Sequence, residues 1–215
     1  GGIALSSCSP SRSLSCSAFA PCTRRASGIS RHCSLSSRGM RRLYSSTPWA
    51  TQDGILVPTA QTVAERAGVG IRTVFRHFAD METLFATMDV QLRESYEGLF
   101  AGGDRAGTLA ERILHVIERR ATAYEKMSSL MLSTRAQMWR SPVLQKNYAR
   151  NQRGLRKDLA DWLPEVAELP ALRREAVDAA TSFETWNRLR VHQGLSVKAS
   201  MDVVYEILRL TFDLK

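Results

Sequence analysis

The chain contains 215 residues, of which 44% are hydrophobic, and its formal net charge is +9. This length allows one large domain or two small ones, and the apolar share is that of an ordinary globular protein. No apolar run approaches the ~18–20 residues that a membrane-spanning helix needs, so we expect no membrane partner.

The positive charge is concentrated in the first 52 residues, which contain seven arginines, no lysine and no acidic residue. The rest of the chain holds 23 basic and 21 acidic residues and is nearly neutral. The high net charge is therefore no argument that the folded part binds nucleic acid.

Residues 1–50 are rich in Ser, Arg and Cys and have no hydrophobic period, so we expect them to be disordered. Three interpretations stay open: a natural basic arm, an organelle transit peptide, or an artefactual N-terminus from a wrong start or reading frame. The spacing of the four cysteines fits no zinc pattern, which favours free thiols at Cys8, Cys16, Cys22 and Cys33. Because the remaining chain lacks Cys, we expect a cytoplasmic protein.

From residue 59 onward, apolar residues recur three and four positions apart, which predicts an all-α protein. Thr59 can cap a short helix through Arg66, and a turn at 67–70 leads to a second short helix over 71–77. Asp80 can cap a longer helix to about Phe100. Further helices are predicted from Thr108, over 127–139, from Ser141 to about Leu163, over 171–193 and over 196–213.

Two short helices joined by a sharp turn predict a helix-turn-helix over residues 59–78. Gly68 can adopt a positive φ at no steric cost, and Ala64 is small where the helices meet. Three valines are spaced to close a small core beneath the motif: Val63, Val69 and Val74. The second helix is then free to enter a major groove about 12 Å wide.

The order of residues in this motif resembles the TetR (tetracycline-repressor-like) family of bacterial transcriptional regulators. The family pattern is a Thr cap, Ile/Val-Ala-Glu-x-Ala-Gly-Val-Ser, Thr-x-Tyr-x-His-Phe and Lys-Glu-x-Leu. It is matched by 63–69, 73–78 and 82–84. The resemblance implies a helix-turn-helix DNA-binding domain over about 51–100 and a helical ligand-binding and dimerisation domain over 101–215.

The motif assigns DNA contacts to the cap and the second helix: Thr59, Ile71, Arg72, Thr73, Phe75, Arg76 and His77. The alternatives are a solvated face for the arginines and a helix cap for Thr73 and His77. Core packing is the favoured position for Phe75 and Phe78.

Three positions depart from the family pattern, because Gly70 stands for Ser, Phe75 for Tyr and Met81 for Lys. Fewer bonds to the DNA phosphates should weaken DNA affinity and flatten its salt dependence. The family's first amphipathic helix is not recognisable over 41–58, which favours an artefactual N-terminus. The alternative function is therefore a helical ligand-binding and dimerisation protein of the same fold that has lost DNA binding.

The resemblance also implies an effector cavity between the middle helices, for a small and mainly apolar ligand. Core packing is the alternative for any one of its candidate residues. The candidates are His115, Tyr124, Met127, Met131, Met138, Trp139, Phe183 and Trp186.

Family members dimerise through their last two helices, and a dimer suits the reading of a palindromic operator of double-stranded DNA. Packing within one subunit is the alternative for the residues concerned. They are Leu172, Ala176, Ala179, Met201, Val204, Leu208 and Phe212.

No catalytic constellation is apparent in the sequence: there is no phosphate loop, no Gly-x-Ser-x-Gly elbow and no paired-Cys metal site. We therefore expect a non-enzymatic protein without cofactor or metal. The sequence favours a dimeric repressor that a small-molecule effector releases from its operator.

Overall fold

The computed structural model describes residues 56–214, and every regular element in this range is a helix. The all-α prediction is confirmed. The elements are α3 (Ala60–Ala67), α4 (Ile71–His77), α5 (Met81–Glu97), η1 (Gly98–Phe100), α6 (Leu109–Met138), α7 (Pro142–Trp162), η2 (Pro164–Glu168), α8 (Ala171–Ala180), α9 (Phe183–Asn187), the π-helical η3 (Arg188–His192) and α10 (Val197–Thr211). The expectations for residues 1–50, including the four cysteines, lie outside the described residues.

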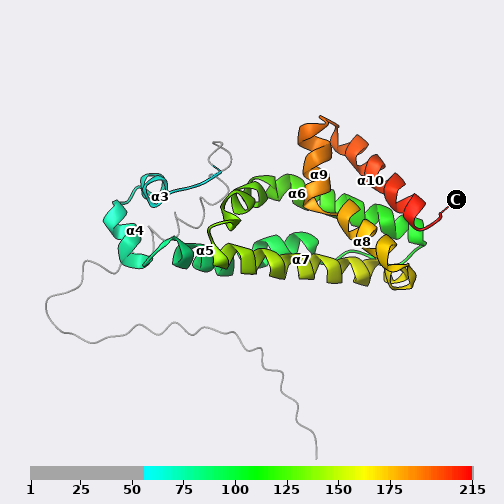
Figure 1. The fold of residues 1–215 in the computed structure, drawn as a ribbon, viewed down its shortest axis with the longest axis horizontal. Helices are drawn as coiled ribbons and strands as arrows, with labels where there is room; N and C mark the ends of the chain where they lie inside the picture. Colours follow the sequence, from blue (N-terminus) through cyan, green and yellow to red (C-terminus); the bar gives the residue numbers. More distant parts are fainter. Residues whose placement is uncertain (1–55, 215) are drawn as a thin grey trace, which may run out of the picture.

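The molecule is elongated, with α3 and α4 at one end and α8, α9 and α10 at the other (Figure 1). Helix α5 leads from the first end to the long pair α6 and α7, and it packs along α7. The main core lies where α6, α7 and α10 meet, around Ile113, Ile117, Leu159, Trp162 and Leu208.

The helix starts predicted from capping residues are confirmed. The side chains of Thr59, Asp80 and Ser141 each accept a hydrogen bond from a backbone N–H in the first turn of the helix that follows. Thr108 and Glu111 form a reciprocal capping box at the start of α6, which satisfies two of the N–H groups left unpaired at a helix start.

The separate helix expected over 127–139 does not exist. Helix α6 is continuous over 30 residues from Leu109 to Met138. No glycine or proline interrupts this stretch, and the paired serines Ser128 and Ser129 are not sufficient to end a helix that is packed along its length.

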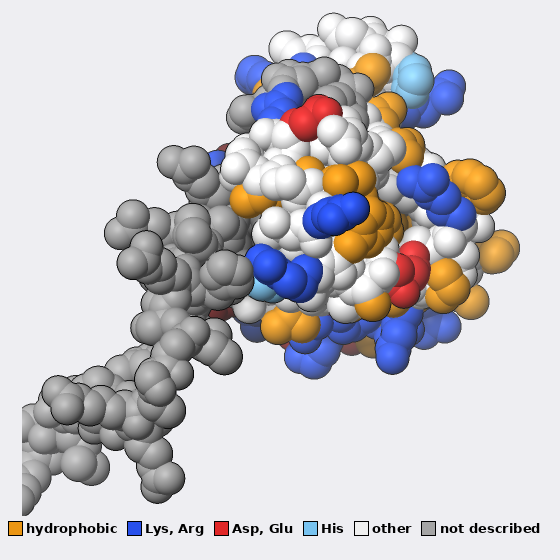
Figure 2. Space-filling view, turned by 90° about the vertical axis from the view of Figure 1, so that its left-hand side faces the viewer, with side chains coloured by type: hydrophobic (Ala, Val, Ile, Leu, Met, Phe, Trp, Pro, Cys, Tyr) orange, Lys and Arg blue, Asp and Glu red, His pale blue; other side chains and the backbone are white. Residues whose placement is uncertain are grey.

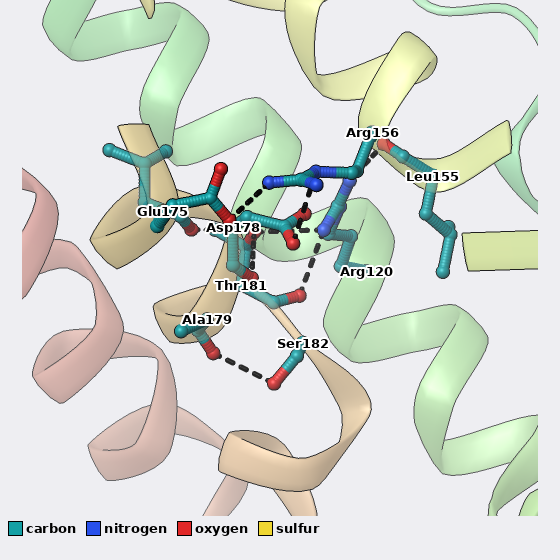
Figure 3. Close-up of polar contacts among 9 residues, drawn as sticks. Arg120, Leu155, Arg156, Glu175, Asp178, Ala179, Thr181 and Ser182 are labelled. Carbon is teal, nitrogen blue, oxygen red and sulfur yellow. Dashed lines mark hydrogen bonds and ion pairs between the residues drawn. The ribbon is translucent and has the colours of Figure 1, made fainter. Parts of the chain in front are cut away.

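The single helix expected over 171–193 is also wrong, because the chain breaks at Thr181 and Ser182. Buried Arg120 of α6 donates to the carbonyl and the hydroxyl of Thr181, both at 2.9 Å, and Tyr124 donates to the same carbonyl. Arg120 also donates to the carbonyl of Leu155 on α7 at 2.7 Å (Figure 3). These bonds take up the carbonyl of Thr181 and join α6, α7 and the α8–α9 turn, and Ser182 then caps α9.

Candidate nucleic-acid interface and effector cavity

The turn between α3 and α4 is built around Gly68. Its φ is 64°, a left-handed conformation that favours glycine, and its N–H donates to the carbonyls of Ala64 and Glu65. The N–H of Val69 also donates to the carbonyl of Ala64, at 3.0 Å. These bonds close the end of α3 and direct the chain sharply into α4.

A small core of its own supports these two helices. Val63, Ala64, Val74, Phe78 and Leu84 are buried against one another. Val69 packs against them from a partly buried position, as do Met81 and Met88. The core therefore includes Leu84 of α5, so that α5 is packed directly beneath the helix-turn-helix.

Helix α4 presents four residues that are exposed to solvent: Ile71, Arg72, Phe75 and Arg76. Thr73 and His77 are half-buried. Thr59 is exposed, but its hydroxyl accepts from the N–H of Thr62 and so serves as the cap of α3. This end of the molecule shows prominent Lys and Arg side chains and few acidic ones (Figure 2).

Phe75 does not pack in the core as expected, since 51% of its side chain is exposed. Val74 of α4 and Phe78, which directly follows the helix, already fill the small core. Phe75 follows Val74 and is turned about 100° away from it around the helix axis. An exposed aromatic ring beside Arg72 and Arg76 places Phe75 on the same surface as the predicted DNA contacts.

Residues 51–88 match the family model described as bacterial regulatory proteins, tetR family. The chain carries a TetR-family DNA-binding domain. This match confirms the resemblance that the motif suggested, and the domain supports the role of a TetR-type DNA-binding transcriptional regulator. No curated protein and no solved structure matches the chain.

Three sets of contacts join the TetR-type domain to the rest of the chain. The carbonyl of Leu56 accepts from the hydroxyl of Ser133 on α6 at 2.9 Å. The carboxylate of Glu82, on the first turn of α5, accepts from the N–H of Val143 at the start of α7 at 3.1 Å. Farther along α5, Asp89 pairs with Arg150 of α7 at 2.8 Å.

A cavity of about 440 Å³ lies between α5, α6 and α7. Its walls include Val63 of α3 and Met81 at the start of α5, so it reaches the base of the helix-turn-helix. Of the residues predicted for the effector site, three line it: Tyr124, Met127 and Met131.

The other five candidates do not line this cavity. His115 packs edge-on to Trp162, and Phe183 and Trp186 are buried behind Tyr124. Met138 lies at the end of α6, and Trp139 just after it is 79% exposed. Apolar residues stand at the consecutive positions 130–132 near the end of α6, so sequence alone did not separate the residues that face the cavity from those that pack against Phe183 and Trp186.

The cavity also has a polar wall that the sequence pattern does not predict. Asp89 accepts three hydrogen bonds, from Arg93 at 2.6 Å, from the Tyr96 hydroxyl at 2.7 Å and from Arg150 at 2.8 Å. The spacing of Asp89, Arg93 and Tyr96 along one helix face could have indicated part of this cluster. The contact with Arg150 could not be predicted in this way, because Arg150 lies 61 residues from Asp89 in the sequence.

The electrostatics of the cluster favour an ionised Asp89 and a neutral Tyr96. Burial acts to raise the pKa of Asp89, but the hydrogen bonds from Arg150, Arg93 and Tyr96 outweigh it, and the pKa is lowered. Burial and the hydrogen bond to Asp89 raise the pKa of Tyr96 to about 12. Asp89 is therefore ionised at neutral pH, and its ion pair with Arg150 (the charged tie) links α5 to α7.

The residues predicted for the dimer interface fall into two groups. On α8, Leu172 is 86% exposed, and Ala176 and Ala179 are exposed as well. The neighbouring Arg173 donates to the carbonyl of Thr211 at 3.1 Å, so the start of α8 lies beside the end of α10.

The predicted stripe of α10 instead faces its own subunit. Val204 and Leu208 are 4% and 1% exposed and belong to the main core, and Met201 and Phe212 pack against that core. This stripe is buried because α10 closes the core over α6 and α8. Apolar side chains on the outer face of α10 are exposed at Ile207 and Leu210.

Within residues 56–214, none of the helices combines the length and the apolar character of a membrane span, and His, Cys, Asp and Glu side chains form no group that could hold a metal ion.

Replacing Asp89 by Asn tests the charged tie. Because the folded pKa lies below the ordinary value of 3.8, the ionic contribution is complete above that value and is lost as pH falls through the folded pKa. We expect D89N to lower the free energy of unfolding by about 1–3 kcal/mol at neutral pH, with the difference shrinking below pH 3.8. Urea unfolding at a series of pH values measures it. The control is E94Q, an exposed acid on the same helix, and a D89N effect that is independent of pH would contradict the tie.

Proposed function

We propose that the protein is a dimeric repressor that a small, mainly apolar effector releases from a palindromic operator. The observation that carries the proposal is the position of the cavity, whose walls include α5 and Val63 of α3 as well as α6 and α7. A ligand in this space touches both the TetR-type domain, about 51–100, and the regulatory domain, about 101–215. It can therefore favour one arrangement of the two domains over another.

For operator reading, we assign the exposed face of α4 to the major groove. Arg72 and Arg76 supply two positive charges, and α4 contains no acidic residue. Thr73 and His77 flank them at half-buried positions, and Ile71 and Phe75 offer apolar contacts to thymine methyl groups or sugars. Bacterial DNA lies in the cytoplasm, which is where such a regulator works.

For dimerisation, we assign the surface of α8 and the outer face of α10. The exposed Leu172, Ile207 and Leu210 are large apolar side chains on these two helices, and Val191 of η3 is 64% exposed as well. Such apolar side chains are typical of the centre of a subunit interface. The helix-turn-helix motifs of the two subunits (residues 59–78, the reading heads) then face the two halves of a palindrome.

Replacing Arg76 by Ala tests the reading face. With the full chain and a duplex from the region upstream of its own gene, fluorescence anisotropy over a salt series should show a slope of log affinity against log salt that is shallower by about 0.9 for each subunit. K198A, at the far end of the molecule, is the control and should keep the wild-type slope. If the wild-type chain shows no salt-dependent DNA binding but still dimerises and binds a ligand, the alternative of a protein that has lost DNA binding replaces the proposal.

Replacing Leu210 by Glu tests the dimer surface. A charge in an apolar interface cannot be desolvated without a large cost, so L210E should be monomeric where the wild type is dimeric. Light scattering after size-exclusion chromatography gives the mass of each. V90E places the same charge on an exposed apolar site of α5 and should remain a dimer. A dimer of unchanged stability in L210E would exclude this surface.

A further inference from the structure

The chemistry of the cavity wall identifies a class of effector. We propose that the effector is a single-chain carboxylate with an unbranched apolar tail, and that its head group replaces Asp89 as the partner of Arg150. This inference rests on the proposed function, because it names the ligand of the same cavity.

The shape of the cavity suits a chain. Its lining runs from Met81 to Ala101 beside α5, about 30 Å at ~1.5 Å per residue, and from Leu144 to Asp158 on α7, about 21 Å. A volume of about 440 Å³ along walls of this length suits an extended chain better than a rounded ligand. Most of its walls are apolar or aromatic, with residues such as Leu84, Phe85, Met88, Leu92, Phe100 and Met127.

The one arginine of the cavity wall marks the place where an anionic head group can bind. Among the described residues that line it, Arg150 is the one cation. The Nε atom of Arg150 is buried and has no hydrogen-bond partner in the described part of the chain. Asn147 and Asn151 already accept from its other nitrogens, at 3.2 and 3.1 Å. A carboxylate that arrives here therefore meets the positive charge of Arg150, and a turn of this side chain toward the ligand could bring the unpaired Nε into use.

The exchange of Asp89 for a ligand carboxylate keeps the charges balanced. Asp89 has two cationic partners, Arg93 at 2.6 Å and Arg150 at 2.8 Å, whereas Arg150 has one carboxylate partner in the described structure. When Arg150 turns to the ligand, Asp89 retains Arg93 and the Tyr96 hydroxyl. No buried charge is left without a partner, so the usual cost of breaking a buried ion pair does not arise.

Two other acidic residues line the channel, Glu97 and Asp158, and Glu97 is exposed to solvent at the end of α5. Asp158 is half-buried, and its carboxylate lies in the field of Arg105, Arg119 and Arg120, which oppose a further positive charge. Asp158 and Arg150 are eight residues apart on α7, about 12 Å at ~1.5 Å per residue. The anionic head is thus assigned to the middle of the channel, and the tail to the apolar end beside Met81, Leu84 and Leu144.

The exchange has a regulatory consequence. The pair between Asp89 and Arg150 is a direct tie between α5, which is packed beneath the helix-turn-helix, and α7. A ligand that occupies Arg150 removes this tie while its tail separates the walls of the channel. The reading head is then free to leave the position in which it fits the operator.

Binding of defined probes to the full-length wild-type protein tests the proposal. Titration calorimetry with hexanoate, octanoate, decanoate and dodecanoate should show affinity rising by about fourfold per methylene until the channel is filled. The alcohol and the primary amine of each chain length are the matched probes. We expect the carboxylates to bind about 10- to 100-fold more tightly than the alcohols.

Arg150→Gln should abolish the preference for carboxylate over alcohol while the dependence on chain length remains. The matched control is Arg153→Gln, an exposed arginine on the same helix, which should keep both. The wild-type probe series decides the head-group preference even if R150Q fails to fold. Equal binding of acids and alcohols, tighter binding of amines, or no binding by any chain would each overturn the proposal.

Operator release is measured separately, by anisotropy of the labelled duplex with and without each carboxylate. Carboxylate binding without any DNA binding would leave the ligand class standing and overturn the proposed repressor. DNA binding that no carboxylate affects, together with no calorimetric signal, would overturn the ligand class and leave the repressor standing.

Discussion

The pair between Asp89 and Arg150 holds the helix that follows the reading head against the body of the protein. Asp89 sits in the middle of α5, and only 11% of its side chain is exposed. Since Leu84 of the same helix belongs to the core of the helix-turn-helix, a shift of α5 moves α3 and α4 with it. The cavity lies along this helix, which makes the pair the point at which a ligand and an operator can affect one another.

The reading head was predictable because its determinants are local. Gly68 sets the turn, Thr59 caps α3, and the valines of the small core lie within a few turns of one another. Phe75 was misplaced because its apolar character outweighed its position on the helix, one residue beyond Val74. Where neighbours in sequence determine the conformation, pattern and propensity are sufficient.

The regulatory part was predictable in its helix starts but not in its breaks or in its polar contacts. At the break, the carbonyl of Thr181 accepts from Arg120, which lies 61 residues earlier in the chain. Arg150 and Asp89 look like surface charges in the sequence, and only the packing of α7 along α5 makes them partners. In the sequence, the apolar stripe of α10 is equally typical of a subunit interface and of a core. The contacts of α10 with α6 and α8 show that Val204 and Leu208 belong to the core.

A double-mutant cycle on operator affinity tests the central claim most directly, with D89N, R150Q and the double variant measured by anisotropy against one duplex. If the pair transmits the state of the cavity to the reading head, the effects of the single substitutions on operator affinity are not additive, and the coupling is about 0.5–3 kcal/mol. Additive effects, or unchanged affinity in all three variants, would show that the pair stabilises the fold without any part in DNA recognition.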